Sequence, residues 1–463
     1  MTGDTAAIEI SQLQEHRHPG ERRDPVYRQT TPIQERVMLG IGIDVGTTGV
    51  RAVAIDEHRE IHGQAHVAMA SPRRDGAECD QDPAIWLTAL IQAVDDLLPK
   101  IDRQAVSAIA IDATSGTVLL ADNLGHPSTP ALMYNDGRGT AEAARIAGLA
   151  PSESAAHGPF SSLAKYLWLK RHYPAAANQR VLHQADWLVA TLTGKLGLSD
   201  TNNCLKMGYD PLMRCWPSWL SQLGVEIDRL PSVVEPGTAL ASLLPAWCER
   251  WRLSSGVKLI AGTTDSTAAF LATGADRVGE AVTSLGSTLV LKVLSNEAVF
   301  APQFGVYSQP VGKLWLAGGG SNSGGAVLRH YFNDEALAAL TPQLKPNQPT
   351  QLDYYPLLTP GERFPLCDPN LPPRLTPRPQ DDGVFLQGLL EGMAHIEAEG
   401  YQRLAELGTP YPSSVITIGG GAQNSPWLQI RAKLLGVPIT IAEHQDAAYG
   451  TALLTLPHLV PSP

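Results

Sequence analysis

Apolar residues along the chain fall into short runs of strand length, and several of these runs end in turns rich in glycine, serine or threonine. Residues 41–56 are the clearest case, with two mostly apolar runs joined by Gly46-Thr47-Thr48-Gly49. Apolar runs of this length predict β-strands, and the short connection predicts a hairpin. Asp44 lies at the end of the first strand, where its carboxylate would face whatever the turn holds.

The same patterns predict an alternation of strands and helices in the rest of the chain. Asp82-Pro83 is typical of a helix start, and Trp86, Leu90, Val94 and Leu97 follow at the spacing of one buried helix face. Further strands are expected at 61–70, 105–112, 118–120, 257–262, 281–291 and 415–418, and further helices after 138, 161, 184, 266, 384 and 425. Residues 352–380 are rich in proline and predict a long surface excursion.

The first hairpin suits a phosphate group. Small side chains let backbone N–H groups come close, and the hydroxyls of Thr47 and Thr48 add donors. A lone carboxylate would repel phosphates, so Asp44 is expected to act through a metal ion, for which Mg²⁺ with its oxygen ligands is the candidate. The alternative is a plain hairpin whose glycines and threonines serve only the bend.

A second stretch repeats this design. Residues 281–291 again give a strand, a turn (Gly286-Ser287-Thr288) and a second strand. Just before it, Asp265 follows the strand at 257–262 and precedes a helix, where a single Asp is by default an N-cap. Two such units predict two similarly built domains that face each other across a cleft, with the phosphates of a nucleotide between them.

Two other turns are candidates for ligand contacts. Residues 113–117, Ala-Thr-Ser-Gly-Thr, lie between two apolar strands, and a plain β-turn explains them equally well. The glycines at 419–421 precede a helix opened by Pro426, so an adenosine could lie against bare backbone there. Packing or flexibility is the alternative role for these glycines. Neither these glycines nor the glycine-rich strand end at 316–326 fits a P-loop or a G-x-G-x-x-G unit.

Composition limits the class of protein. With 463 residues the chain predicts two domains, or three, and its net charge of −11 argues against a general nucleic-acid binder and gives no cationic surface for acidic membranes. The five cysteines are far apart and form no C-x-x-C pair, which indicates neither a disulfide framework nor a zinc site. No apolar run is long enough to predict a membrane span. We therefore expect a cytoplasmic protein.

The first 37 residues differ from the rest. They are polar and lack apolar periodicity, so we expect a disordered extension, and they lack the apolar centre of a secretory signal. Because Met38 directly precedes the first strand, a translation start there would remove a segment that the fold does not need. The predicted division is an extension at 1–37, a first domain at 38–256 and a second domain at 257–463.

These stretches together resemble the FGGY carbohydrate kinases of the actin-like, hexokinase-like ATPase superfamily, from Met38 to about His458. The resemblance rests on an ordered set of motifs: Asp44-x-Gly46-Thr47-Thr48 with Arg51, Gly262-Thr263-Thr264-Asp265, Gly286-Ser287-Thr288, Gly361-Glu362-Arg363-x-Pro365, and Gly419-Gly420-Gly421-Ala422 followed by Trp427 and Ala447-Ala448-Tyr449-Gly450-Thr451-Ala452. It implies an α/β fold of two ribonuclease H-like ATPase domains around a central cleft, ATP and Mg²⁺ as cofactors, and a small sugar as substrate.

The resemblance also assigns roles to residues. Asp265 matches the general base that takes the proton from a primary hydroxyl of the sugar, and Asp44 matches the residue near Mg²⁺, which it would contact through water. Ser115, Ser266, Asp44 and Asp265 fall at substrate-binding positions. The ATP and phosphate positions are Thr47, Thr48, Gly286, Ser287, Gly420, Gly421 and Asn424. The first domain would bind sugar and phosphate, and the second the nucleotide.

Residues 111–120 and 263–266 are most similar to the pentulose kinases of photosynthetic organisms, whose expected substrate is D-ribulose. Where glycerol kinases carry Arg-Glu and Gln, this chain has Thr114-Ser115 and Ser266, which leaves room for a larger polyol. D-xylulose, which differs at one stereocentre, is the alternative substrate. A sugar-responsive regulator or a chaperone-like ATPase would need an additional DNA-reading, partner-binding or client-binding part, and the sequence shows none.

Overall fold

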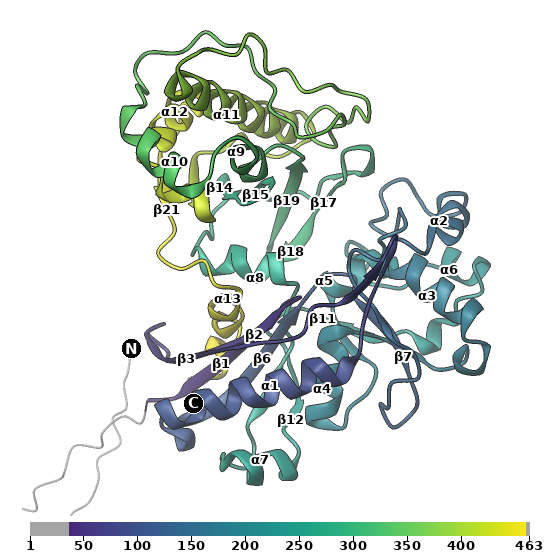
Figure 1. The fold of residues 1–463 in the computed structure, drawn as a ribbon. Helices are drawn as coiled ribbons and strands as arrows, with labels where there is room; N and C mark the ends of the chain where they lie inside the picture. The colour runs from purple at the N-terminus through teal and green to yellow at the C-terminus, as the bar shows by residue number, and fades with distance from the viewer. Residues whose placement is uncertain (1–36, 460–463) are drawn as a thin grey trace, which may run out of the picture. The chain divides into compact units, whose positions relative to one another are not determined.

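The computed structural model describes residues 37–459. The disordered extension expected at 1–37 therefore lies, apart from Val37, outside the described residues. Two six-stranded sheets dominate the described part, and each begins with one of the two predicted hairpins (Figure 1). The α/β class predicted from the alternation of elements is confirmed.

The first sheet has the strand order β12-β13-β6-β1-β2-β3. In chain order its strands are β1 (Leu39–Val45), β2 (Gly49–Ile55), β3 (Ile61–Ala68), β6 (Val106–Ala113), β12 (Ala239–Ser242) and β13 (Lys258–Ile260). β1 pairs antiparallel with β2 and parallel with β6, and β13 pairs parallel with β6. Parallel pairing at the centre means that β1 and β6 end at the same edge of the sheet.

The second sheet has the order β18-β19-β15-β14-β20-β21. Its strands are β14 (Glu280–Leu285), β15 (Leu289–Ser295), β18 (Gln309–Val311), β19 (Leu314–Ser321), β20 (Ser414–Ile418) and β21 (Ile439–Ile441). An antiparallel hairpin, β14 with β15, is again flanked by an antiparallel third strand and by two parallel strands, β20 and β21. The series β3-β2-β1-β6-β13 is thus repeated as β19-β15-β14-β20-β21, as two similarly built units require.

The remaining strands form smaller sheets. A five-stranded sheet contains β4 (Arg73–Asp75), β5 (Glu78–Gln81), β7 (Val118–Ala121), β8 (Ala131–Leu132) and β9 (Arg180–His183). Two-stranded pairs are made by β10 (Leu198–Asp200) with β11 (Ser232–Val234), and by β16 (Phe300–Ala301) with β17 (Val306–Tyr307).

Helices cover both sheets. The α-helices are α1 (Pro83–Leu97), α2 (Thr140–Ala147), α3 (Ser162–His172), α4 (Gln184–Thr193), α5 (Thr201–Cys204), α6 (Trp219–Gln222), α7 (Pro245–Trp251), α8 (Asp265–Ala272), α9 (Gly325–Tyr331), α10 (Asp334–Leu340), α11 (Asp382–Glu406), α12 (Ser425–Leu435) and α13 (Ala447–Leu453). α1 packs across β2 and β3, and α11 runs beside α12 and β19 (Figure 1). Asp82 caps α1 at the Ala84 amide, and the predicted face of Trp86, Leu90, Val94 and Leu97 is fully buried, so this prediction is confirmed.

Two helices link the sequence halves at the first sheet. α13 comes from the last part of the chain, yet it packs on β1, β2 and β6 and on α8. Glycines allow this approach: a Cβ on Gly42 of β1 would lie 2.1 Å from the Ala448 carbonyl oxygen, and one on Gly450 of α13 would lie 1.8 Å from that of Ala268. Because β13 also joins the first sheet, the predicted division near Val257 stays a prediction.

The segment at 352–380 has no helix or strand, as expected, but it is not wholly a surface excursion. Tyr354, Tyr355, Leu357 and Phe364 are buried in the core beneath the second sheet. Phe364 fills space left by glycines, since a Cβ on Gly319 would lie 2.6 Å from its ring. The burial of this segment has a simple cause: its aromatic side chains anchor an irregular backbone without any periodic pattern.

Candidate active site

Asp44 stands at the centre of the site. It is the sixth residue of β1, where the strand pairing places Arg51 of β2 on one side and Asp112 of β6 on the other. Its Oδ2 accepts a hydrogen bond from Nη1 of Arg51 at 3.3 Å, and its side chain is 7% exposed. Burial and the nearby carboxylate of Asp265 raise the pKa of Asp44 to about 6, while Arg51 lowers it. The site thus concentrates negative charge that a cation would relieve.

The turn after Asp44 is a tight hairpin. The Gly46 amide donates to the Gly49 carbonyl at 3.0 Å, so the glycines do serve the bend. Thr47 is half-buried and Thr48 is exposed, and within residues 37–459 neither hydroxyl forms a hydrogen bond. Both hydroxyls are therefore available to a ligand, and the structure is compatible with the phosphate role and with the plain-hairpin role.

Asp265 reaches the same region from α8. The bridge between Ala113 and Thr264 brings the start of α8 to the end of β6, and Thr264, not Asp265, holds the N-cap position. Oδ1 of Asp265 accepts from the Ser266 amide at 2.7 Å. Burial raises the pKa of Asp265, against the lowering effects of the Ser266 amide, Lys206, Lys292 and the Ser115 amide. The partly accessible carboxylate is thereby held in the surroundings that a general base requires.

Ser115 and Asp265 are 150 residues apart in the sequence, yet the Ser115 amide acts on the Asp265 carboxylate. The neighbouring Thr114 is turned inward: its hydroxyl bonds to Oε1 of Gln184 at 2.6 Å and to Thr117. Of the predicted pair Thr114-Ser115, only Ser115 is therefore placed beside Asp265. Four predicted positions, Asp44, Ser115, Asp265 and Ser266, are brought together by the ends of β1 and β6 and the start of α8.

Asp112 also belongs to this cluster, although no sequence motif predicted it as a site residue. It is fully buried beside Asp44, and the hydroxyl of Thr451 on α13 donates to its Oδ2. Its Oδ1 has no partner within residues 37–459. Burial, together with Asp44, raises the pKa of Asp112. An Asp at the same position of a second strand was the available signal, but only the parallel pairing of β1 with β6 makes it meaningful.

Ser266 lines a cavity of about 270 Å³. Strands β15 and β19 and the segment around β17 line this open cavity, and its lining is Ser266, Val290, Lys292, Phe304, Gly305, Tyr307, Gln309, Leu316, Gly318, Gly319, Gly320 and Arg363. The Ser266 carbonyl accepts a hydrogen bond from Nζ of Lys292. A cavity of this size, lined by the residue that follows Asp265, is large enough for a small polyol.

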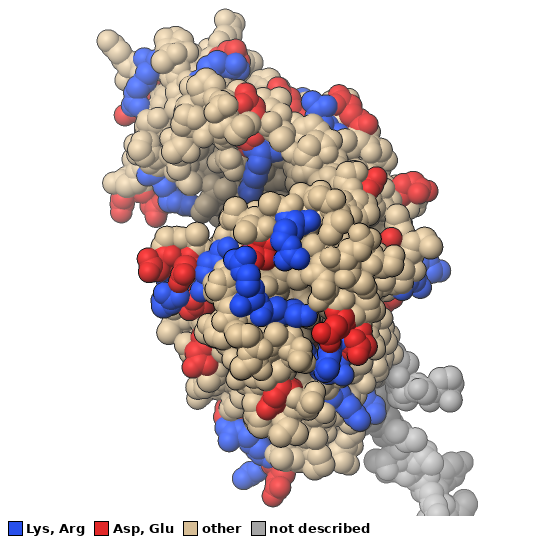
Figure 2. Space-filling model, turned by 90° about the vertical axis from the view of Figure 1, so that its right-hand side faces the viewer, with Lys and Arg blue, Asp and Glu red and all other residues tan. Residues whose placement is uncertain are grey.

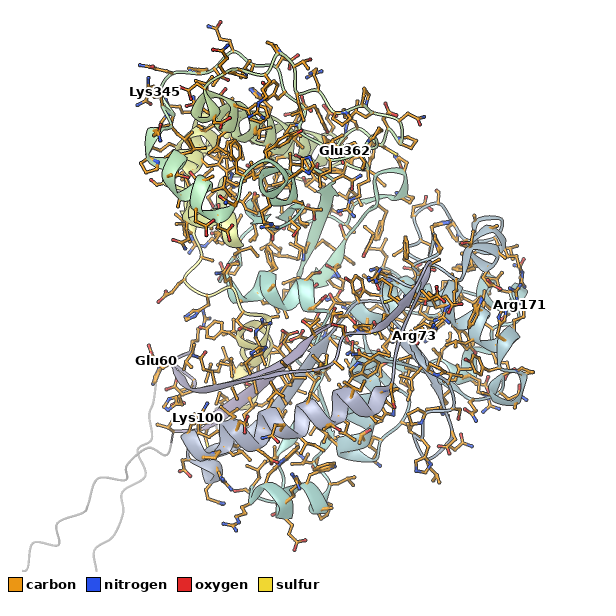
Figure 3. The ribbon with its side chains drawn as sticks, in the orientation of Figure 1. Glu60, Arg73, Lys100, Arg171, Lys345 and Glu362 are labelled. Carbon is orange, nitrogen blue, oxygen red and sulfur yellow. The ribbon has the colours of Figure 1, made fainter. Side chains whose placement is uncertain are left out.

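The motif Gly361-Glu362-Arg363-x-Pro365, which contains Phe364, lies at the edge of this cavity. Glu362, labelled in Figure 3, accepts from Oγ of Ser321 at 2.5 Å, from the Asn322 amide at 2.8 Å and from the Tyr355 hydroxyl at 3.0 Å. These bonds tie the motif to the end of β19 and bring Arg363 to the cavity wall. Glu362 is thus a structural residue.

The second predicted phosphate turn is joined to α9. The Gly286 carbonyl accepts from the Gly325 amide at 2.9 Å, and Oγ of Ser287 accepts from Nη2 of Arg329 at 3.0 Å. Gly286 is half-buried and Ser287 is exposed. No hydrogen bond of the described chain connects this turn with Asp44 or Asp265, so its phosphate role stays a prediction.

The glycine-rich turn after β20 divides into a packed and an open part. A Cβ on Gly421 would lie 2.6 Å from the Trp427 ring, so packing explains this glycine, whereas a Cβ on Gly420 would meet nothing within 4 Å. Asn424 caps α12 by accepting from the Trp427 amide at 3.0 Å. Its amide also donates to the Thr341 hydroxyl at 3.4 Å. Contact of these residues with a nucleotide stays a prediction, and Gly420 has the open backbone that it requires.

Over residues 37–459 no group of three or more His, Cys, Asp or Glu side chains is placed to hold a metal ion, and no helix is long and apolar enough to cross a membrane. The face in Figure 2 carries Lys and Arg side chains alongside Asp and Glu, so neither sign of charge covers it alone. Because the described residues supply no such metal-binding group, a metal ion at Asp44 would need further ligands from water or from a bound phosphate chain.

Two family models match the chain. The model for the N-terminal domain of the FGGY family of carbohydrate kinases matches residues 39–272, and the model for the C-terminal domain of that family matches residues 281–456.

Curated relatives extend over most of the chain. It is 26% identical over 423 residues to a xylulose kinase of Escherichia coli, an alignment that covers 86% of this chain and 84% of the relative. It is 27% identical over 451 residues to a xylulose kinase of Streptomyces coelicolor, with 90% and 88% covered.

Solved structures share the fold. The crystal structure of a xyloylose kinase from Brucella ovis superposes with a TM-score of 0.82 at 26% identity and covers 92% of this chain and 91% of its own. A Plasmodium falciparum glycerol kinase solved with ADP has a TM-score of 0.79 at 14% identity, covers 92% and 91%, and supports the fold alone. The predicted two-domain, actin-like α/β architecture is thereby confirmed.

Proposed function

Because the chain belongs to the FGGY family of carbohydrate kinases, we propose that it transfers the γ-phosphate of ATP to the 5-hydroxyl of a ketopentose, D-ribulose in the first place. The observation that carries the proposal is the convergence of Asp44, Ser115 and Asp265 from three separate segments, with Ser266 opening onto a cavity of about 270 Å³. One end of such a site can activate a hydroxyl while the other holds the sugar.

Asp265 has the part of general base in this proposal. A sugar hydroxyl is a poor nucleophile at neutral pH, and a positioned carboxylate contributes about 10²–10⁴ in rate. As the oxygen of the 5-hydroxyl forms its bond to the γ-phosphorus, its proton passes to Asp265, and the bond from that phosphorus to the β–γ bridging oxygen breaks to release ADP. The raised pKa of Asp265 makes the carboxylate a stronger base than an ordinary surface Asp.

Asp44, Thr47 and Thr48 would hold the phosphate end. Mg²⁺, when bound with ATP, would neutralise the developing charge on the phosphate oxygens. The residues fit this ion, because the carboxylates of Asp44 and Asp265 raise the energy of each other's charged form and a cation relieves that repulsion. The free hydroxyls of Thr47 and Thr48 supply donors for phosphate oxygens.

We assign the nucleotide to the second domain, 257–463, and the sugar together with the first phosphate turn to residues 38–256. The second phosphate turn, Gly286-Ser287, and the open backbone at Gly420 support the nucleotide assignment. Closure over both ligands would exclude water, which otherwise competes as phosphate acceptor.

Two observations rank the candidate substrates. The motifs at 111–120 and 263–266 resemble kinases of D-ribulose, and small hydroxyl side chains at Ser115 and Ser266 leave room for a pentulose. The curated relatives described above are named xylulose kinases, which supports D-xylulose as the second candidate. The two sugars differ at one stereocentre, and both carry a primary hydroxyl for Asp265.

The test is sugar-dependent release of ADP from Mg·ATP, measured with D-ribulose, D-xylulose and L-ribulose at equal concentrations. We expect the highest kcat/KM with D-ribulose and phosphate on O5 of the product. A higher value with D-xylulose would replace the substrate but keep the kinase. Binding of sugar and ATP without ADP release would instead indicate a non-catalytic regulator on the same fold.

A further inference from the structure

Lys292 is a cation in the cavity beside Asp265 whose role the motifs do not explain. It lies on β15, half-buried, and its Nζ donates to the Ser266 carbonyl. Among residues 37–459 no carboxylate lies within ion-pair distance of this ammonium group. A lysine ammonium has three N–H donors, so donors remain for a ligand after the bond to Ser266.

The cavity around Lys292 offers donors and no acidic side chain. None of its lining residues is Asp or Glu, and its second cation, Arg363, has no ion pair or side-chain hydrogen bond within the described residues. Glycines keep the space open: a Cβ on Gly320 would lie 3.0 Å from Nη2 of Arg363, and one on Gly318 would lie 3.0 Å from Cγ of Lys292. A ligand that fills this space must bring hydrogen-bond acceptors.

We infer that Lys292 donates a hydrogen bond to the C2 carbonyl oxygen of the ketopentose whose 5-hydroxyl lies at Asp265, and that it thereby determines the selectivity for a keto sugar. The inference rests on the proposed function. Ser266 adjoins both groups, because it follows Asp265 in the chain and accepts from Lys292. Lys292 also lowers the pKa of Asp265, so the ammonium group and the carboxylate lie within electrostatic range of each other.

The chemistry of ketopentoses gives this contact a purpose. A free 5-hydroxyl can add to the C2 ketone of its own molecule, and the resulting ring has no 5-hydroxyl to phosphorylate. A donor that holds the carbonyl apart from the 5-hydroxyl selects the open form. A pentitol, which has a hydroxyl in place of the ketone, lacks the carbonyl acceptor and would gain less from Lys292.

The experiment compares the wild type with Lys292→Met and Lys292→Arg. Lys313→Met is the matched control, since Lys313 is an exposed lysine on the turn between β18 and β19. Calorimetry measures the Kd of D-ribulose, of D-xylulose and of the pentitol ribitol, each with a non-hydrolysable ATP analogue and Mg²⁺ present. Thermal unfolding and the Kd of the analogue report whether the fold and the nucleotide site are intact.

We expect K292M to weaken binding of the preferred ketopentose at least about 10-fold, as loss of a charged donor does, and to leave ribitol and nucleotide binding within about twofold. K292R, which keeps a cation, should recover part of the loss, and K313M should match the wild type. A purely structural role for Lys292 would weaken ketose and pentitol equally, and that result overturns the inference.

Other outcomes are equally decisive. Unchanged ketopentose binding in K292M, with wild-type binding intact, overturns the role of Lys292 and leaves the proposed kinase standing. Preferential binding of inorganic phosphate by the wild type, lost in K292M, would identify an anion site instead and overturn the carbonyl contact. Failure of the wild type to bind any ketopentose removes the proposed function, and this inference with it.

Discussion

Asp265 combines partial exposure with a raised pKa, and both features matter for a base that works on a bound hydroxyl. The Asp265→Asn variant removes the proton acceptor while keeping the size of the side chain. We expect it to fold normally and to lose at least about 100-fold in kcat. ADP release at saturating sugar measures kcat, and thermal unfolding measures whether the variant folds normally. Turnover close to that of the wild type would remove Asp265 from the reaction.

The pH dependence of activity follows from the charges around Asp265. Burial raises its pKa, Lys206 and Lys292 lower it, and it faces Asp44 and Asp112. Only the ionised form can accept a proton, so the acid limb of kcat should lie above the range of an ordinary Asp.

Removing one of the cations should shift this limb. In Lys206→Met the ionised form of Asp265 loses a favourable partner, so its pKa rises further and the acid limb of kcat moves to higher pH. A profile of kcat against pH for wild type and K206M measures the shift. A limb that stays at the wild-type pH would show that Lys206 does not act on Asp265.

Motifs predicted most of the residues at the site but not all. Asp44 and Asp265 each follow a strand and precede a turn or helix start, which is a local pattern. Asp112 also ends a predicted strand and precedes a turn, but its importance comes from pairing with Asp44, which lies 68 residues earlier in the sequence on a parallel strand. Lys292 lies in the middle of a strand, and the local sequence carries no motif that predicts a site there. Its neighbour Ser266 belongs to α8, and the packing of β15 against that helix brings the two residues together.

At the scale of elements, the contact between α8 and α13 positions Asp265. A Cβ on Gly450 would lie 1.8 Å from the Ala268 carbonyl oxygen, which is backbone and cannot rotate away. Gly450→Ala gains about 1 kcal/mol in helix propensity. Overpacking costs about 1–3 kcal/mol or more, so the clash should prevail.

We therefore expect G450A to lower both the melting temperature and kcat, since α8 carries Asp265 at its first position. Gly148→Ala is the control, because a Cβ there would meet its nearest neighbour at an ordinary 3.6 Å. Chemical unfolding and steady-state kinetics measure the two effects. A G450A variant as stable and active as the wild type would show that α8 and α13 can move apart to admit the added Cβ without cost.

Sequence patterns predicted the elements better than their partners. Both hairpins, α1 and the helix caps at Asp82 and Ser161 carry short-range signals, and the structure contains all of them. Tyr354 and Phe364 lie in a proline-rich stretch without periodicity, so their burial could not be read locally. The pairing of β13 with β6 in the first sheet is likewise long-range, and the three residues of β13 give no local signal of it.

At the scale of the whole molecule, the metal is expected to belong to the nucleotide and not to the fold. Within residues 37–459 no cluster of three metal-ligating side chains exists. Excess EDTA should therefore abolish ADP release yet leave the melting temperature of the ligand-free protein within about 1 °C, because removing an ion that the ligand-free protein does not bind leaves its stability unchanged. A large fall in that temperature would reveal a structural ion.

The position of α13 has a consequence for biosynthesis. Residues 447–453 cover β1, near the beginning of the chain, and Thr451 holds the buried Asp112. Nascent chains leave the ribosome from the N-terminus onward. The strand that carries Asp44 can therefore pack against α13 only after more than 400 further residues have been translated. A premature stop codon between β13 and α13 would leave every strand of the first sheet encoded, yet the apolar surface of its central strand exposed to water and prone to aggregation.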